Sequence, residues 1–413
     1  MRVTRQRSLS LVVLLNLCVV FPMVPGRANT DAAGPAASDP AKRQKAVALF
    51  AQGKRLEALP LLQELAEQNP QDAELLVALA ASLIDHAATL SDPEAAGKER
   101  FHAADLAKRA WELGDTSPLG ENLRQLLGEL PADGAIKFSA NPAVERIMDA
   151  SEAAFARRDF DTALRDYAQA LELEPANYSA VLFTGNTYDR KNDFAQASVW
   201  YERAIRLDPN VETAYRYYAD MLAKQGDMVK SRSLLIHAAV AEPYNKIVWR
   251  EIRAWAIINH TAFNIVYVGI PRPPKGYPQF QGVSSAWSKY YSVRADWRTG
   301  GKFHEQFPQE ADYRHSLQEE SEALTAAARI LEALKRDQKT HDSVAGDPVA
   351  GLLLKLHEAG LIDPYVLFSL GDDDLAKDYK AYRARNRAKL ENYLDQFVMP
   401  PVAAQKKRLQ NFF

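Results

Sequence analysis

The feature that most constrains this chain is a proline spacing of 34 residues. Pro175, Pro209 and Pro243 lie 34 positions apart, twice in succession. A fixed period of about 20 to 50 residues is typical of repeat architectures, in which one small structural unit stacks on copies of itself. Because each unit then contacts mainly its neighbours, the chain is expected to fold as a row of units.

Other residue types recur in register with these prolines. Small residues stand 12 and 5 positions before each proline, a bulky residue stands 8 positions before, and an aspartate followed by Phe or Met begins each set: Asp159, Ala163, Tyr167 and Ala170; Asp193, Ala197, Tyr201 and Ala204; Asp227, Ser231, Leu235 and Ala238. Small residues let two antiparallel helices approach closely. Proline ends the second helix, since it has no N–H and clashes with the preceding turn. The pattern therefore predicts helical hairpins.

This pattern resembles the tetratricopeptide repeat, a helix–turn–helix unit of 34 residues. The resemblance implies a mainly α fold, a superhelical α–α solenoid, with an array over residues 141–260 that holds three clear repeats and a partial fourth near Trp249. Looser helices of the same kind are expected over residues 43–130, where Ala58 precedes Pro70 by 12 positions. Residues 261–413 are expected to hold a loop-rich aromatic segment and then more helices, with no recognised family.

Arrays of this family act by binding, through a concave groove lined by the first helix of each unit. The resemblance implies that exposed positions of these helices contact a protein or peptide partner: Glu152, Asn186, Arg190, Arg216, Asp220 and Lys224. Asn186, Arg190, Arg216 and Lys224 form a possible anchor set for a carboxylate or backbone carbonyl of an extended peptide. Only Asn186 and Arg216 match the carboxylate-binding set of the chaperone-binding members, so a solvated groove of mixed charge remains the alternative.

The N-terminus is typical of a secretory signal peptide. Arg2, Arg5 and Arg7 precede an apolar run from Leu9 to Phe21, which is shorter than the roughly 20 residues that span a bilayer. Small residues at Gly26 and Ala28 predict cleavage after residue 28, followed by a flexible leader over 29–42. The protein is thus expected to be exported, periplasmic or secreted, with no membrane span after cleavage and no cysteine, since Cys18 is the single cysteine.

The charge balance argues against one class of partner. Formal net charge is -2, so a nucleic-acid-binding surface is not expected.

The C-terminal third leaves two alternative functions open. One is an exported enzyme that acts on cell-envelope polymers with its chemistry in 261–413, where His304, Glu305 and His315 are the densest group of titratable residues. The other is a carbohydrate-binding module, which requires at least two of Trp287, Tyr290, Tyr291 and Trp297 to be exposed and coplanar. No catalytic residue, metal site or cofactor is predicted, and the "GDDD" stretch from Gly371 to Asp374 is interpreted as a helix cap.

Overall fold

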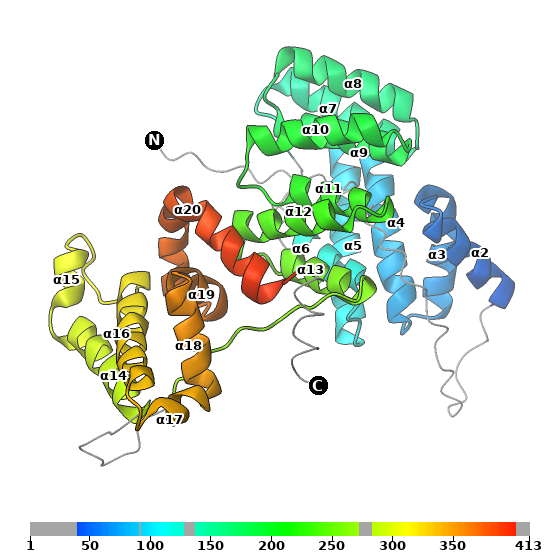
Figure 1. Ribbon diagram of the computed structural model, residues 1–413. Helices are drawn as coiled ribbons and strands as arrows, with labels where there is room; N and C mark the ends of the chain where they lie inside the picture. The colour runs from blue at the N-terminus through cyan, green and yellow to red at the C-terminus, as the bar shows by residue number, and fades with distance from the viewer. Residues whose placement is uncertain (1–38, 91, 128–136, 272–282, 402–413) are drawn as a thin grey trace. The chain divides into compact units, whose positions relative to one another are not determined.

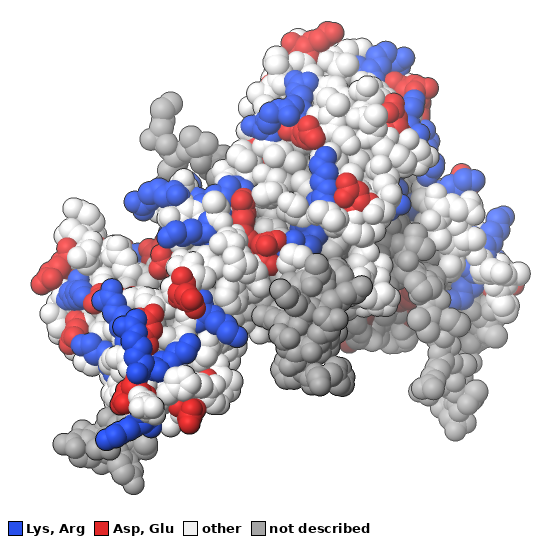
Figure 2. Space-filling model, viewed as in Figure 1, with Lys and Arg blue, Asp and Glu red and all other residues white. Residues whose placement is uncertain are grey.

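The computed structural model describes residues 39–90, 92–127, 137–271 and 283–401 (Figure 1). The predicted signal peptide 1–28 and residues 29–38 of the predicted leader lie outside these ranges, and the first described helix begins at Pro40. Within the described ranges the chain is mainly helical and has no strand, as the mainly α prediction requires. None of the described helices combines the length and the apolar character needed to cross a membrane. On the face drawn in Figure 2, basic and acidic side chains are interspersed.

The chain divides into two compact units, Met1–Leu234 and Leu235–Phe413. The boundary falls inside helix α12 (Met228–Ala241), whereas the sequence pattern placed its border between residues 260 and 261. The end of α12 and the partial fourth repeat therefore belong to the second unit.

The first unit is a succession of helices joined by turns. Each packs mainly on its neighbours along the chain, and α4 also packs on α7. The helices are α2 (Pro40–Ala51), α3 (Arg55–Gln68), α4 (Ala73–Thr89), α5 (Pro93–Glu112), α6 (Pro118–Leu127), α7 (Pro142–Ala156), α8 (Phe160–Leu173), α9 (Tyr178–Arg190), α10 (Phe194–Leu207), α11 (Thr213–Lys224) and the first part of α12. Figure 1 shows α7 to α10 as two hairpins, α7–α8 and α9–α10.

The recurring aspartates begin the second helix of each hairpin. Their carboxylates accept backbone N–H groups three residues further on, from Thr162 to Asp159 (3.2 Å), from Gln196 to Asp193 (3.2 Å) and from Lys230 to Asp227 (3.0 Å). An N-cap of this kind stabilises a helix by typically about 1 kcal/mol. The prolines follow the ends of α8, α10 and α12 by two residues, as predicted.

The turn before each aspartate has one backbone conformation, whatever residue occupies it. The residue just before the aspartate has a positive φ in all three hairpins, and the same position of the partial fourth repeat has one too: Arg158 (63°), Asn192 (60°), Gly226 (86°) and His260 (50°). These positions are 34 residues apart. Only Gly226 adopts this region without a steric cost, so the repeat imposes the conformation on the other three.

Small residues sit where the helices of a hairpin meet. Ala163, Ala170, Ala197 and Ala204 are all 0% exposed, and so are Tyr167 and Tyr201. At Gly185 a Cβ atom would lie only 3.0 Å from Cδ1 of Tyr201. The small-and-aromatic skeleton is therefore the packing surface of the array, as the sequence predicted.

The second unit holds the end of α12 and a further set of helices. They are α13 (Lys246–Ile258), α14 (Val283–Thr299), α15 (Lys302–Gln306), α16 (Leu317–Arg336), α17 (His341–Ala345), α18 (Pro348–Glu358), α19 (Ile362–Ser369), α20 (Asp373–Tyr393) and the π-helical turn η1 (Leu394–Val398). Figure 1 shows α14 and α16 side by side.

Two contacts hold the extended segment of the second unit and its last helix. The Asn264 N–H donates to the Val398 carbonyl (2.8 Å), which fixes the segment after α13 to η1. The Tyr379 hydroxyl donates to the Val240 carbonyl (2.8 Å), which ties α20 to the end of α12. The segment around Phe263, which begins the predicted loop-rich aromatic segment, forms neither a helix nor a strand.

Candidate protein-binding site

Three of the six predicted groove residues are buried. Glu152 accepts a hydrogen bond from the hydroxyl of Tyr167, so it joins the two helices of its own hairpin. Arg216 is only 1% exposed and forms an ion pair with Glu212, one turn earlier on α11. Asn186 is 5% exposed. The expectation that Glu152, Asn186 and Arg216 lie exposed in a groove was therefore wrong, and Glu152 and Arg216 instead hold the array together.

The other three predicted residues, together with Asp189, form a cluster at the ends of α9 and α11. We call Asp189, Arg190, Asp220 and Lys224 the α9–α11 charge cluster. Lys224 is the most exposed member, and its ammonium lies 2.5 Å from the Asp220 carboxylate. Burial raises the pKa of Asp189, the charges of Lys224 and Arg190 oppose the rise, and Asp220 adds to it. The four groups therefore lie within electrostatic reach of one another.

A carboxylate of an earlier helix also interacts with this cluster. Asp85 of α4 is buried, and burial raises its pKa to about 6 against the opposing charges of Arg55 and Arg190. One guanidinium nitrogen of Arg55 lies 3.6 Å from the Asp85 carboxylate. The cations of the cluster thus already face acidic groups of the same unit. A surface with both signs of charge fits a partner segment that carries both signs better than it fits a lone anion.

One polar group beside this cluster has no partner in the described part of the chain. The side-chain amide nitrogen of Asn186 is buried and makes no hydrogen bond there. A buried donor without an acceptor is costly, and such groups often mark a function. Asn186 lies one helical turn before Arg190 on α9, and its amide nitrogen is enclosed within the array.

The three titratable residues singled out in the C-terminal third, His304, Glu305 and His315, do not form one cluster. His304 and Glu305 are exposed on α15, and Nδ1 of His304 lies 3.3 Å from the backbone carbonyl of Glu310. His315 instead lies between two carboxylates, with Nδ1 2.6 Å from Asp372 and Nε2 2.8 Å from Glu320. Since both ring nitrogens are engaged, His315 has no free nitrogen with which to act as a general base.

Glu320 is the centre of a buried polar network that the sequence interpretation missed. It accepts from the hydroxyl of Tyr290 (2.6 Å) and lies 3.2 Å from the guanidinium of Arg294, in addition to its contact with His315. Arg294 also donates to Glu319 (2.9 Å). The signal was present in the sequence, because Glu320 stands three residues after Leu317 and four before Leu324, on the apolar stripe of its helix.

The aromatic residues proposed for carbohydrate stacking do not form an exposed platform. Trp287, Tyr290 and Trp297 are buried, and the rings of Tyr290 and Tyr291 are nearly perpendicular, at 83°. These side chains instead fix α14 in the second unit, which contradicts the carbohydrate-binding alternative.

The "GDDD" stretch caps α20, as predicted. Asp372 is the N-cap residue, and its carboxylate accepts from the Leu375 N–H (2.7 Å). Among the described residues no group of three or more His, Cys, Asp or Glu side chains is arranged to hold a metal ion.

Comparison with known proteins identifies the repeats. A family model of the tetratricopeptide repeat matches residues 148–212 and 185–245. The protein O-mannosyl-transferase Tmtc2 of Drosophila melanogaster is 36% identical over 69 residues, which cover 16% of this chain and 7% of that protein. The chain thus spans less than a tenth of that relative, and the likeness is confined to a short segment.

Solved structures with some likeness include two of MamA and one of the P58(IPK) TPR domain. A crystal structure of MamA is 15% identical with a TM-score of 0.24, covering 50% of this chain and 97% of that one. MamA of Desulfovibrio magneticus RS-1 is 14% identical with a TM-score of 0.23, covering 51% and 99%. The P58(IPK) domain is 13% identical with a TM-score of 0.26, covering 85% and 96%. At these values the likeness adds nothing to the assignment.

Proposed function

Since residues 148–245 are tetratricopeptide repeats, we propose that this protein is an interaction scaffold that binds a partner protein through the α9–α11 charge cluster. The observation that carries the proposal is that packing residues and accessible charged residues occupy different positions of the repeat. The small and aromatic residues that recur every 34 positions are buried in the packing of the hairpins, whereas the cluster residues differ from one repeat to the next and are partly or fully exposed.

The cluster favours a partner segment that carries charges of both signs. Lys224 and Arg190 would pair with a carboxylate of the partner, and Asp220 and Asp189 with a cation. Charge-assisted contacts of this kind are among the stronger polar contacts that a protein makes.

Charge reversal at Lys224 tests this proposal. Cross-linked pull-downs from cells that produce the protein would compare the unaltered chain with Lys224→Glu. We expect at least one partner to be captured about tenfold less by the variant, because one charge-assisted contact is replaced by repulsion. Lys224 is chosen rather than Arg216, since reversal of a buried charge would unfold the unit.

Arg206→Glu is the matched control for this experiment. Arg206 lies on α10, the second helix of its hairpin, is well exposed, and follows Glu202 by four residues as Lys224 follows Asp220. The partner should be captured by Arg206→Glu as by the unaltered chain. Equal capture by all three proteins would contradict a role for the cluster.

We also propose that the protein is exported, on the strength of the basic, apolar and small-residue segments of residues 1–28. Mass spectrometry of the protein isolated from its own cells should find a mature N-terminus at Asn29. An intact N-terminus in a protein that stays in the cytoplasm would contradict export.

A further inference from the structure

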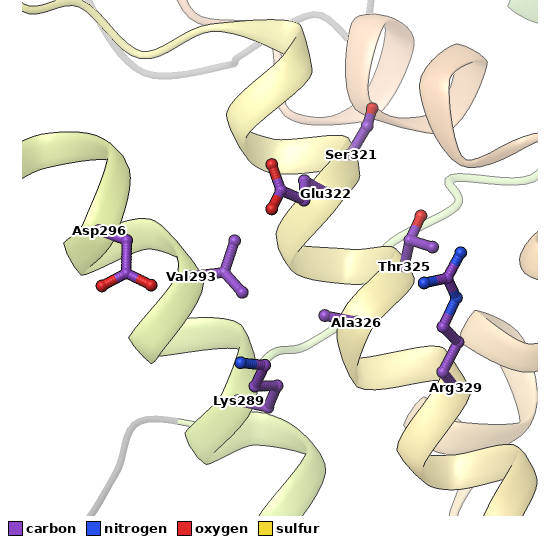
Figure 3. A pocket seen from close by; sticks show the side chains of 8 residues that line it. All are labelled: Lys289, Val293, Asp296, Ser321, Glu322, Thr325, Ala326 and Arg329. Carbon is purple, nitrogen blue, oxygen red and sulfur yellow. The ribbon is translucent and has the colours of Figure 1, made fainter. Parts of the chain in front are cut away.

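The second unit contains a furrow between α14 and α16, separate from the repeats that carry the proposed function. Its volume is about 440 Å³, within the range of roughly 300–1,000 Å³ that small-molecule sites occupy. Figure 3 shows the side chains that line it. The ones that matter here are Lys289, Val293 and Asp296 from α14, and Glu322, Ala326 and Arg329 from α16.

The charged groups of the furrow are separated by sign. In Figure 3, Asp296 and Glu322 lie toward one end, and Lys289 and Arg329 lie toward the other. This follows from the sequence. Asp296 comes seven residues after Lys289 on α14, whereas Glu322 comes seven residues before Arg329 on α16. Because the two helices run in opposite directions, the two acidic residues lie at the same end. Val293 and Ala326 lie between the two ends and make the middle apolar.

Most of these charges are available for a ligand. The side chains of Lys289, Asp296 and Arg329 make no hydrogen bond or ion pair within the described ranges, whereas Glu322 already accepts from Trp297 (2.9 Å) and Lys302 (2.5 Å). Burial raises the pKa of Glu322, but its hydrogen bonds to Lys302 and Trp297 and the charges of Lys302 and Lys289 lower the pKa by more. The net pKa lies below the ordinary value, so Glu322 is ionised at neutral pH. Because Lys302 offsets the charge of Glu322, Asp296 supplies the negative charge of the acidic end that a ligand can pair with.

The separation of the two ends defines the length of a fitting ligand. Seven residues of α-helix span about 10 Å. A ligand with a cation at one end, an anion at the other and an uncharged middle of that length would pair with both ends at once. A chain of three residues in an extended conformation also spans about 10 Å, and its free termini are an ammonium and a carboxylate.

We propose that this furrow binds short peptides of about three residues through their two free termini. The peptide ammonium pairs with Asp296, and the peptide carboxylate pairs with Lys289 and Arg329. The Val293 and Ala326 side chains contact the middle of the peptide, where their small size admits small or apolar residues. A simple anion would meet only the basic end and is not the expected ligand.

Calorimetric titration of the full chain with trialanine tests the proposal. Trialanine with both termini free should bind, and N-acetyl-trialanine and trialanine amide should each bind about tenfold or more weakly, since each lacks one charged contact. Absence of binding up to about 10 mM trialanine, a weak-affinity limit, would overturn the proposal. Equal binding of the blocked peptides would overturn it too.

Two matched variants locate the binding in the furrow. Lys289→Gln should weaken trialanine binding about tenfold, whereas Lys335→Gln, the same change at an exposed position of α16 outside the furrow, should leave it unchanged. Equal weakening by the two variants would show that the peptide binds elsewhere. Neither lysine belongs to the first unit, so failure here leaves the proposed scaffold function unaffected, and the pull-down with Lys224→Glu tests that separately.

Discussion

Arg216→Met is expected to lower the free energy of unfolding by about 3–5 kcal/mol, because it leaves the Glu212 carboxylate buried without its cation. The side chains of Arg216 and Glu212 are 1% and 3% exposed. Urea denaturation followed by circular dichroism would measure the change as a lower midpoint of the transition that reports on the first unit.

Lys224→Met is the matched control on the same helix. Lys224 follows Asp220 by four residues, as Arg216 follows Glu212, but its side chain is 44% exposed. An exposed pair contributes about 0–1 kcal/mol, so this variant should unfold close to the unaltered midpoint. The double variant Glu212→Gln and Arg216→Met should recover much of the lost stability, since it leaves neither charge of this buried pair. Equal losses for the two single variants would contradict the structural role of Arg216.

Glu320→Gln is expected to destabilise the second unit by about 3 kcal/mol at pH 6. The change removes the buried negative charge that faces Arg294 and His315, while Glu319 continues to pair with Arg294. Thermal unfolding measured at pH 6 and pH 9 would show the loss. Glu322→Gln, the same change two residues further on at a partly exposed position, should cost about 1 kcal/mol or less.

The same network predicts how the stability of the unaltered protein depends on pH. Burial lowers the pKa of His315, but its hydrogen bonds to Glu320 and Asp372 prevail and raise it above the ordinary value of 6.5. The stabilisation from protonated His315 is therefore fully present below about pH 6.5 and is lost as the pH rises through the raised pKa. The effect of Glu320→Gln should thus be smaller at pH 9. A loss that is larger at pH 9 than at pH 6 would contradict the protonated state of His315.

The sequence was sufficient to predict the hairpins, because their determinants are local. The prolines, the small residues and the aspartates act within one hairpin or between neighbours, and their register survives in the sequence. The turns with a positive φ were harder to predict from the sequence. Gly226 is a residue type that indicates such a turn, but Arg158 and His260 are not. Their conformation comes from the repeat around them and not from their own preferences.

The accessible site could be predicted only in part, because burial depends on partners that helix periodicity does not reveal. Arg216 occupies a position of its helix that the repeat pattern assigns to the groove. Its side chain is nevertheless buried, where it forms an ion pair with Glu212 one turn earlier. Glu152 likewise bonds to Tyr167 of the same hairpin. Arg190, Asp220 and Lys224 stand near the ends of their helices and stay accessible, although Asp85 of α4 interacts with Arg190 across the unit.

The second unit was the least predictable part, since its network joins residues that are distant in sequence. His315 reaches Asp372 across 57 positions, and Tyr290 reaches Glu320 across 30. No periodic pattern connects such pairs. The helix start at Asp372, by contrast, follows from a local cap and was anticipated.

The most direct test of the account is the affinity of a purified partner, once captured, for three forms of the protein. Isothermal titration should give a Kd about tenfold weaker for Lys224→Glu than for the unaltered chain, and an unchanged Kd for Arg206→Glu. Both variants should show the unaltered circular dichroism spectrum. If all three forms bind the partner with the same Kd, the α9–α11 charge cluster is not the site that binds this partner.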